Sequence, residues 1–198
     1  MNSELSTLID LETIRAAANR IAHIAVRTPL VRAPFPGLSG YGTGKEIRLK
    51  AENLQPMGAF KMRGAANKVL QLTPDEITRG VITYSSGNHA QAVAYASREV
   101  GAKAVIVMPS NAPAIKRAST VSFGADVVDV GPASSERLAM AEKLVNEHGY
   151  VVVPPYDDEQ IIAGQATCGL EIIKNGPKWI WFLHPSVGAG CLAEWRRR

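Results

Sequence analysis

Short runs of apolar residues alternate along the chain with longer segments whose apolar positions recur every three to four residues. The short runs, which predict buried strands, lie at residues 81–84, 104–108, 125–130, 150–153 and 179–183. The longer segments, which predict helices, lie at residues 89–100, 112–122, 134–148 and 160–174. Strands and helices that alternate in this way are typical of right-handed βαβ crossovers. We therefore expect an α/β fold, with parallel sheets covered by helices on both faces.

The first part of the chain has a less regular pattern. Apolar residues recur at helical spacing from Leu11 to Ala25, which predicts a helix over residues 10–26 with Asp10 as its cap. A short strand is predicted over residues 46–51 and a further helix over residues 60–72. In parallel sheets, ligands bind beyond the carboxyl ends of the strands, often where a turn enters a helix. The turns after the strands are therefore the places to look for a functional site.

Composition indicates a folded globular protein and argues against binding to nucleic acid. The chain has 198 residues, of which 46% are hydrophobic and 20% charged, as in a folded globular protein. Three of the charges in its net charge of +4 come from Arg196, Arg197 and Arg198, and the other basic residues are mixed with acidic ones. This pattern does not favour binding to nucleic acid.

Cysteine use and hydropathy bear on the compartment. Cys168 and Cys191 are the two cysteines, and no Cys and His cluster has metal-ligand spacing, so we expect neither a disulfide framework nor a metal site. No apolar run approaches the ~20 residues that span a bilayer, and the N-terminus lacks a secretory signal pattern. We expect a cytoplasmic protein without a membrane partner.

The turn that follows the strand at residues 81–84 is the first candidate site. It consists of Ser85, Ser86, Gly87, Asn88 and His89, and it opens the next helix. Backbone N–H groups at a helix N-terminus, with hydroxyl side chains and a glycine that permits close approach, favour a bound carboxylate or phosphate. Helix capping by Ser86 or Asn88, without a ligand, is the alternative interpretation. A lone histidine such as His89 is more often structural than catalytic.

Two further candidates are a lysine and a run of small residues. Lys61 lies near the start of a predicted helix, where the helix dipole disfavours a positive charge. Phe60 and Met57 provide apolar surface that would lower the pKa of its amine and favour the neutral, nucleophilic form. Small residues at 186–190 follow the predicted strand at 179–183, and their backbone could hold a phosphate.

Three segments in this order resemble motifs of the serine/threonine dehydratase and serine racemase family, which are pyridoxal-phosphate enzymes of the tryptophan-synthase β-subunit fold. They are A59-F-K61, S85-S-G-N-H89 and V187-G-A-G190, and further matches lie at residues 50–58, 109–116, 123–126 and 162–167. The resemblance implies the two-domain architecture known as fold type II. Residues 57–150 would form the smaller domain, and residues 1–56 and 151–198 would form part of the larger one.

The resemblance also implies a role for each matched residue. Lys61 would form the Schiff base with pyridoxal phosphate and then act as the base at the substrate Cα. Phe60 would lie near the cofactor ring, and Asn88 would hydrogen-bond the 3-oxygen of the cofactor. The cofactor phosphate would be held by Gly188, Ala189 and Gly190.

Further residues are assigned to the substrate by the same resemblance. The substrate carboxylate would be taken by the turn of Ser85, Ser86, Gly87, Asn88 and His89. Ser86 would act from the opposite face of the ring in a racemase, and Arg137 would lie on the substrate side.

The activity that the resemblance implies is dehydration of L-threonine or L-serine to a 2-oxo acid and ammonia. Tyr156 stands where racemases tend to have asparagine, which favours the dehydratase over serine racemase activity, the alternative. Ala59 replaces a common serine, and Val187 and Ala189 replace glycines of the phosphate loop. Family members continue past this loop, so an inactive truncated fragment is a second alternative. A homo-oligomer is typical of the full-length family.

Overall fold

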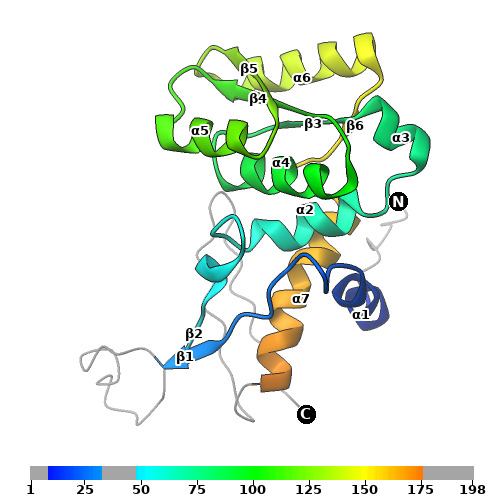
Figure 1. Cartoon of the computed structure of the whole chain (residues 1–198), viewed down its shortest axis with the longest axis vertical. Coiled ribbons are helices and arrows are strands. Elements are labelled where there is room, and N and C mark those ends of the chain that lie inside the picture. Colours follow the sequence, from blue (N-terminus) through cyan, green and yellow to red (C-terminus); the bar gives the residue numbers. More distant parts are fainter. Residues whose placement is uncertain (1–8, 33–47, 176–198) are drawn as a thin grey trace, which may run out of the picture.

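Four parallel strands form the main sheet, in the order β5-β4-β3-β6 (Figure 1). The computed structural model describes residues 9–32 and 48–175. Val81 in β3 lies opposite Ala104 in β4 and Val151 in β6. The expected α/β fold with a parallel sheet is confirmed. The strands are β3 (Val81–Tyr84), β4 (Ala104–Pro109), β5 (Asp126–Val130) and β6 (Val151–Val152).

Helices cover both faces of this sheet, as predicted. Alternate strand residues point to opposite faces, so Val105 and Val107 pack with Ala141 of α6, while Ile106 and Met108 belong to the core on the other face. In Figure 1 α6 lies above the sheet and α4 lies below it. The covering helices are α4 (Asn88–Val100), α5 (Ala114–Ser122) and α6 (Ser134–His148), and α2 (Lys61–Val69) packs on α4.

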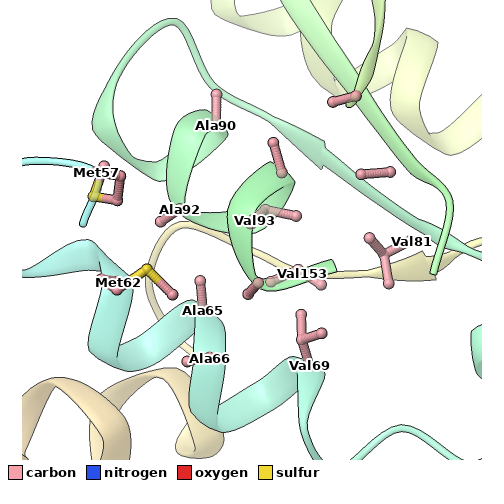
Figure 2. Close-up of a cluster of buried hydrophobic side chains, with 14 of the residues drawn as sticks. Met57, Met62, Ala65, Ala66, Val69, Val81, Ala90, Ala92, Val93 and Val153 are labelled. Carbon is pink, nitrogen blue, oxygen red and sulfur yellow. The ribbon is translucent and has the colours of Figure 1, made fainter. Parts of the chain in front are cut away.

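Alanines allow α2 to pack closely on α4. Ala65 in α2 and Ala92 in α4 are fully buried, and they share a core with Met62, Val69 and Val93. Figure 2 shows Met62, Ala65 and Val69 on the side of α2 that faces α4. Because small side chains let helix axes approach, this pairing places the first residue of α2 beside the first turn of α4.

The helix α7 (Glu159–Asn175) packs against α2 on the side away from α4, and α1 (Leu11–Arg20) packs on α7 (Figure 1). Gly64 and Gly164 make this crossing very close. A Cβ atom added to Gly164 would lie only 2.8 Å from the Cα of Gly64, and one added to Gly64 would lie 2.8 Å from the carbonyl oxygen of Ile161. The backbones of α2 and α7 are therefore in direct contact.

Several elements differ from the sequence prediction. The helix predicted over residues 10–26 ends at Arg20, and the next residues form turns. Strand β1 (Leu30–Arg32) was not predicted; it pairs antiparallel with β2 (Arg48–Lys50), which lies within the predicted strand at 46–51. Two short helices were also missed, the 3-10 helix η1 (Glu52–Leu54) and α3 (Pro74–Arg79).

Two expectations are not settled by these elements. The strand predicted at residues 179–183 lies outside the described residues. The division into a smaller domain at 57–150 and a larger one stays a prediction, and β6 at Val151–Val152 joins the same sheet as β3.

Candidate active site

The amine of Lys61 lies between the start of α2 and the segment that follows β6. Its Nζ donates a hydrogen bond to the carbonyl oxygen of Pro155 at 2.6 Å and lies 5.4 Å from the centroid of the Phe60 ring. The side chain is half-buried, and within residues 9–32 and 48–175 no carboxylate forms an ion pair with it. Burial lowers the pKa of the Lys61 amine below its usual range. A neutral carbonyl oxygen stabilises the charged form of the amine less than a carboxylate would, so the pKa stays lowered.

The turn at residues 85–89 joins the carboxyl end of β3 to α4. The backbone N–H of Ser85 donates to Val107 at 3.2 Å, so the turn leaves the sheet next to β4. Gly87 occupies the N-cap position of α4, and no side chain of the described residues caps the helix. Capping by Ser86 or Asn88, the alternative interpretation of this turn, is therefore not what the structure shows. The first N–H groups of α4 lack a side-chain acceptor, as an anion site requires.

His89 turns its side chain into the protein. It is 3% exposed, and its Nε2 lies 3.0 Å from the carbonyl oxygen of Val153. Since a carbonyl can only accept, Nε2 carries the proton and Nδ1 is the unprotonated nitrogen, which is buried and has no hydrogen-bond partner among the described residues. Burial, with a smaller contribution from the charge of Lys61, lowers the pKa of His89 to about 4. The imidazole is therefore neutral and structural, and what His89 can offer to the predicted carboxylate site is its backbone N–H in the first turn of α4.

Asn88 has a partner that the sequence interpretation did not include. Lys116 in α5 donates from Nζ to the Asn88 side chain at 2.6 Å. Because an ammonium can only donate, the bonded atom is Oδ1, and Nδ2 is left as a donor for another group. Lys116 stands within a matched segment of the family, at residues 109–116, so the signal was present although no role was assigned to it.

The remaining predicted residues lie apart from this group or outside the described residues. Arg137, in the first turn of α6, donates to Pro132 at 3.2 Å and to Ser134 at 2.7 Å. These hydrogen bonds are local, and α6 covers the opposite face of the sheet from α2, so the structure does not bring Arg137 to Lys61. Its contact with a substrate stays a prediction. Gly188, Ala189 and Gly190 lie outside the described residues.

Within residues 9–32 and 48–175 no group of three or more His, Cys, Asp or Glu side chains is placed to hold a metal ion. In this part of the chain, no helix combines the length and the apolar character needed to cross a bilayer.

Comparison with known proteins identifies the family. The model of the pyridoxal-phosphate dependent enzyme family matches residues 21–193. The chain belongs to this family. The catabolic L-threonine dehydratase TdcB of Staphylococcus aureus is 39% identical over 190 residues, which are 94% of this chain and 53% of that relative. The resemblance seen in the three motifs is thus confirmed.

Solved structures of the same family share the fold. The threonine deaminase of T.th. has a TM-score of 0.75 and 44% sequence identity, over 84% of this chain and 51% of that one. Serine racemase from Dictyostelium discoideum has a TM-score of 0.78 and 35% identity, over 86% of this chain and 55% of that one. The chain spans about half the length of the proteins that it matches.

Proposed function

We propose that Lys61 and the turn at residues 85–89 serve the pyridoxal-phosphate-dependent dehydration of L-threonine or L-serine to a 2-oxo acid and ammonia. The observation that carries this proposal is the Lys61 amine. It is half-buried, its pKa is lowered by burial, and its hydrogen-bond partner within the described residues is a backbone carbonyl, beside the start of α4. A lowered pKa increases the fraction of neutral amine, and only the neutral form has the lone pair that both attack on an aldehyde and proton abstraction require.

The residues in place fit pyridoxal phosphate. Lys61 Nζ would bind its aldehyde carbon, and the Nδ2 of Asn88 would donate to its ring oxygen, since Oδ1 is held by Lys116. Phe60, whose ring lies against the Lys61 chain, would provide apolar surface for the cofactor ring. The contact of the cofactor phosphate with Gly188, Ala189 and Gly190 stays a prediction.

Each protein group then has a defined task. The bound cofactor supplies an electron sink for negative charge at the substrate Cα. The N–H groups that open α4 and the hydroxyls of Ser85 and Ser86 hold the substrate carboxylate, which directs the Cα–H bond toward Lys61. Lys61 Nζ removes that proton and returns a proton to the β-hydroxyl, which leaves as water. Hydrolysis of the released unsaturated amine then gives the 2-oxo acid and ammonia.

A racemase is the second candidate because two observations favour it. The serine racemase of Dictyostelium discoideum shares the fold at 35% identity, and the half-buried Ser86 forms no hydrogen bond through its hydroxyl with the described residues. Ser86 would then exchange the Cα proton on the face opposite to Lys61. Tyr156, which is 62% exposed and follows Pro155 directly, supports the dehydratase because racemases tend to have asparagine there.

The proposal also includes the class of substrate, the cellular compartment and the assembly. A small amino acid is the substrate, the cytoplasm is the compartment, and a homo-oligomer is the expected assembly. Burial raises the pKa of the Cys168 thiol to about 11, so this cysteine stays protonated and unreactive at neutral pH. A thiol in that state is compatible with the reducing compartment proposed.

The test begins with the purified chain and added pyridoxal phosphate. We expect a visible absorption band, a borohydride-stable adduct on the Lys61 peptide, and 2-oxo acid from L-threonine or L-serine. Lys61→Ala should abolish all three, whereas Lys103→Ala, at an exposed lysine paired with Asp126, should change none. Formation of D-serine instead of 2-oxo acid would identify the racemase. A folded chain that shows neither band nor adduct contradicts the proposal, and an adduct without turnover supports the inactive fragment.

A further inference from the structure

Arg63, two residues after Lys61 in α2, has every donor of its guanidinium occupied. The side chain is 1% exposed. Its Nε and Nη2 donate to the two carboxylate oxygens of Glu52 at 2.7 and 2.8 Å. Its Nη1 and Nη2 donate to those of Glu171 at 2.8 and 3.0 Å. Thr167 and the carbonyl of Val26 accept as well, at 3.1 and 3.3 Å.

These contacts belong to a larger group, which we call the Arg63 cluster. Lys50 donates to Glu171 and to the carbonyl of Thr28, and the Thr28 hydroxyl donates to Glu52 at 2.6 Å. Two cations and two carboxylates balance each other, as burial of charge requires. Burial alone would raise the pKa of Glu52, but the hydrogen bonds from Arg63 and Thr28 outweigh it and lower that pKa. The cluster consists of Thr28, Lys50, Glu52, Arg63, Thr167 and Glu171.

The Arg63 cluster joins four segments that are distant in sequence. They are residues 26–28, residues 50–52 from the end of β2 to the start of η1, the first turn of α2, and the C-terminal half of α7, which carries Thr167 and Glu171. Breaking a fully paired buried arginine leaves charges without partners, so these segments are held to a single arrangement. Gly64, next to Arg63, brings the backbone of α2 into close contact with α7, so the two helices have no room to move closer at this crossing.

The geometry of α2 connects this cluster to Lys61. Two residues are about 200° apart around a helix, so Lys61 and Arg63 extend to opposite sides of α2. Phe60 occupies the N-cap position without a side-chain cap, so local capping does not fix the first turn. Burial is what lowers the pKa of Lys61, and burial depends on where this turn lies relative to Pro155.

We infer that Arg63 is a positioning residue for Lys61: the Arg63 cluster fixes the first turn of α2 so that Lys61 Nζ lies at the Pro155 carbonyl. Arg63 touches neither cofactor nor substrate in this role. The inference concerns the geometry of the amine and rests on the proposed function only for its bearing on cofactor binding.

The experiment compares Arg63→Gln, Arg63→Lys and Glu171→Gln with the wild-type chain at a temperature where circular dichroism shows each to be folded. Lys61 is labelled with an amine reagent at a series of pH values, and the modified peptide is quantified by mass spectrometry. In Arg63→Gln we expect the pKa of Lys61 to rise toward its usual value, so that its neutral fraction at a fixed pH falls about tenfold. Arg63→Lys keeps the charge but loses the forked geometry, and it should recover part of the shift.

The matched control is Arg117→Gln, which removes an arginine paired with Asp129 on the surface. We expect wild-type labelling of Lys61 in this variant. Cofactor titration by the visible band gives a second measurement, with about tenfold weaker binding expected in Arg63→Gln.

The outcomes separate the two proposals. If Arg63→Gln is folded and both the labelling of Lys61 and the cofactor affinity equal those of the wild type, Arg63 is structural only and the inference is wrong. If Arg63→Gln does not fold, the same comparison in Arg63→Lys and Glu171→Gln decides. A wild-type chain that binds no cofactor refutes the proposed function, while the labelling series still tests Arg63.

Discussion

Replacing Gly164 by alanine tests how closely α2 and α7 approach each other. The added Cβ would press on the carbonyl oxygen of Arg63 and lie 2.7 Å from the Cβ of Asn67 and 2.8 Å from the Cα of Gly64. Carbon atoms in contact prefer about 3.5 Å or more, so the helices must separate by several tenths of an ångström. Two of the three atoms belong to the backbone, which cannot move aside as the end of a flexible side chain can.

The size of the effect follows from two opposing contributions. Overpacking of a close-packed interior costs about 1–3 kcal/mol, and the rigid backbone on the facing side places this site toward the upper end. Alanine itself favours the helix over glycine by about 0.5–1 kcal/mol. We therefore expect Gly164→Ala to lower the free energy of unfolding by about 2 kcal/mol.

Gly169→Ala is the matched control because Gly169 lies in the same helix and, among the described residues outside its own helix backbone, no atom lies within 4 Å of the added Cβ. The helix preference then acts alone, and this variant should be more stable by about 0.5–1 kcal/mol. Urea unfolding followed by circular dichroism at pH 7 measures both free energies. If Gly164→Ala proves as stable as Gly169→Ala, the backbones of α2 and α7 are not in contact, and the argument that this crossing holds Arg63 and Lys61 in place is refuted.

Two further predictions concern the turn at the start of α4. Because the pKa of His89 is lowered from 6.5 to about 4, the unfolded chain takes up this proton first. The stabilisation by neutral His89 is thus complete above about pH 6.5 and lost as the pH falls toward 4. Between pH 7 and pH 5 this loss is about 2 kcal/mol in the free energy of unfolding measured with urea. His89→Gln, which can still donate to the Val153 carbonyl, should remove this pH dependence. If the free energy of unfolding depends on pH in the same way in both proteins, His89 is not buried in its neutral form. Lys116→Met should leave the Asn88 amide free to rotate and weaken cofactor binding about three- to tenfold. Arg117→Met, in the same helix, is the control and should bind the cofactor as the wild type does. Equal affinities in the two variants would show that Lys116 does not orient Asn88.

The alternating elements could be predicted from the sequence because their signals are local. A helix over residues 134–148 and a strand over 81–84 appear with the predicted bounds. The start of α3 also had a local signal that was overlooked: Thr73 and Glu76 form a capping box around Pro74, a pattern that can be read from four residues. Strand β1 had no such signal, since its three residues are ordered by pairing with Arg48–Lys50.

The state of Lys61 depends on contacts that its own neighbours in sequence do not reveal. Phe60 and Met57 predicted a lowered amine pKa. In the structure the Phe60 ring centroid lies 5.4 Å from the amine, and Met57 is buried in the same core as Met62 of α2. The acceptor that holds the amine, however, is the carbonyl of Pro155, and the segment that carries it is fixed from the other side by His89 through Val153. Every residue carries the same backbone carbonyl, so no sequence motif reveals which of them accepts this hydrogen bond.

The same reasoning applies to the face of α2 opposite Lys61. A hydrophobic pattern assigns Arg63 to the solvent, because a charged residue is rarely buried unless it is paired. Its pairing requires Glu52 from the preceding 3-10 helix and Glu171 from the far end of α7, which no local pattern connects. A motif can therefore indicate a candidate reactive lysine, whereas the position of its amine is decided by partners about a hundred residues away on both faces of the helix that carries it.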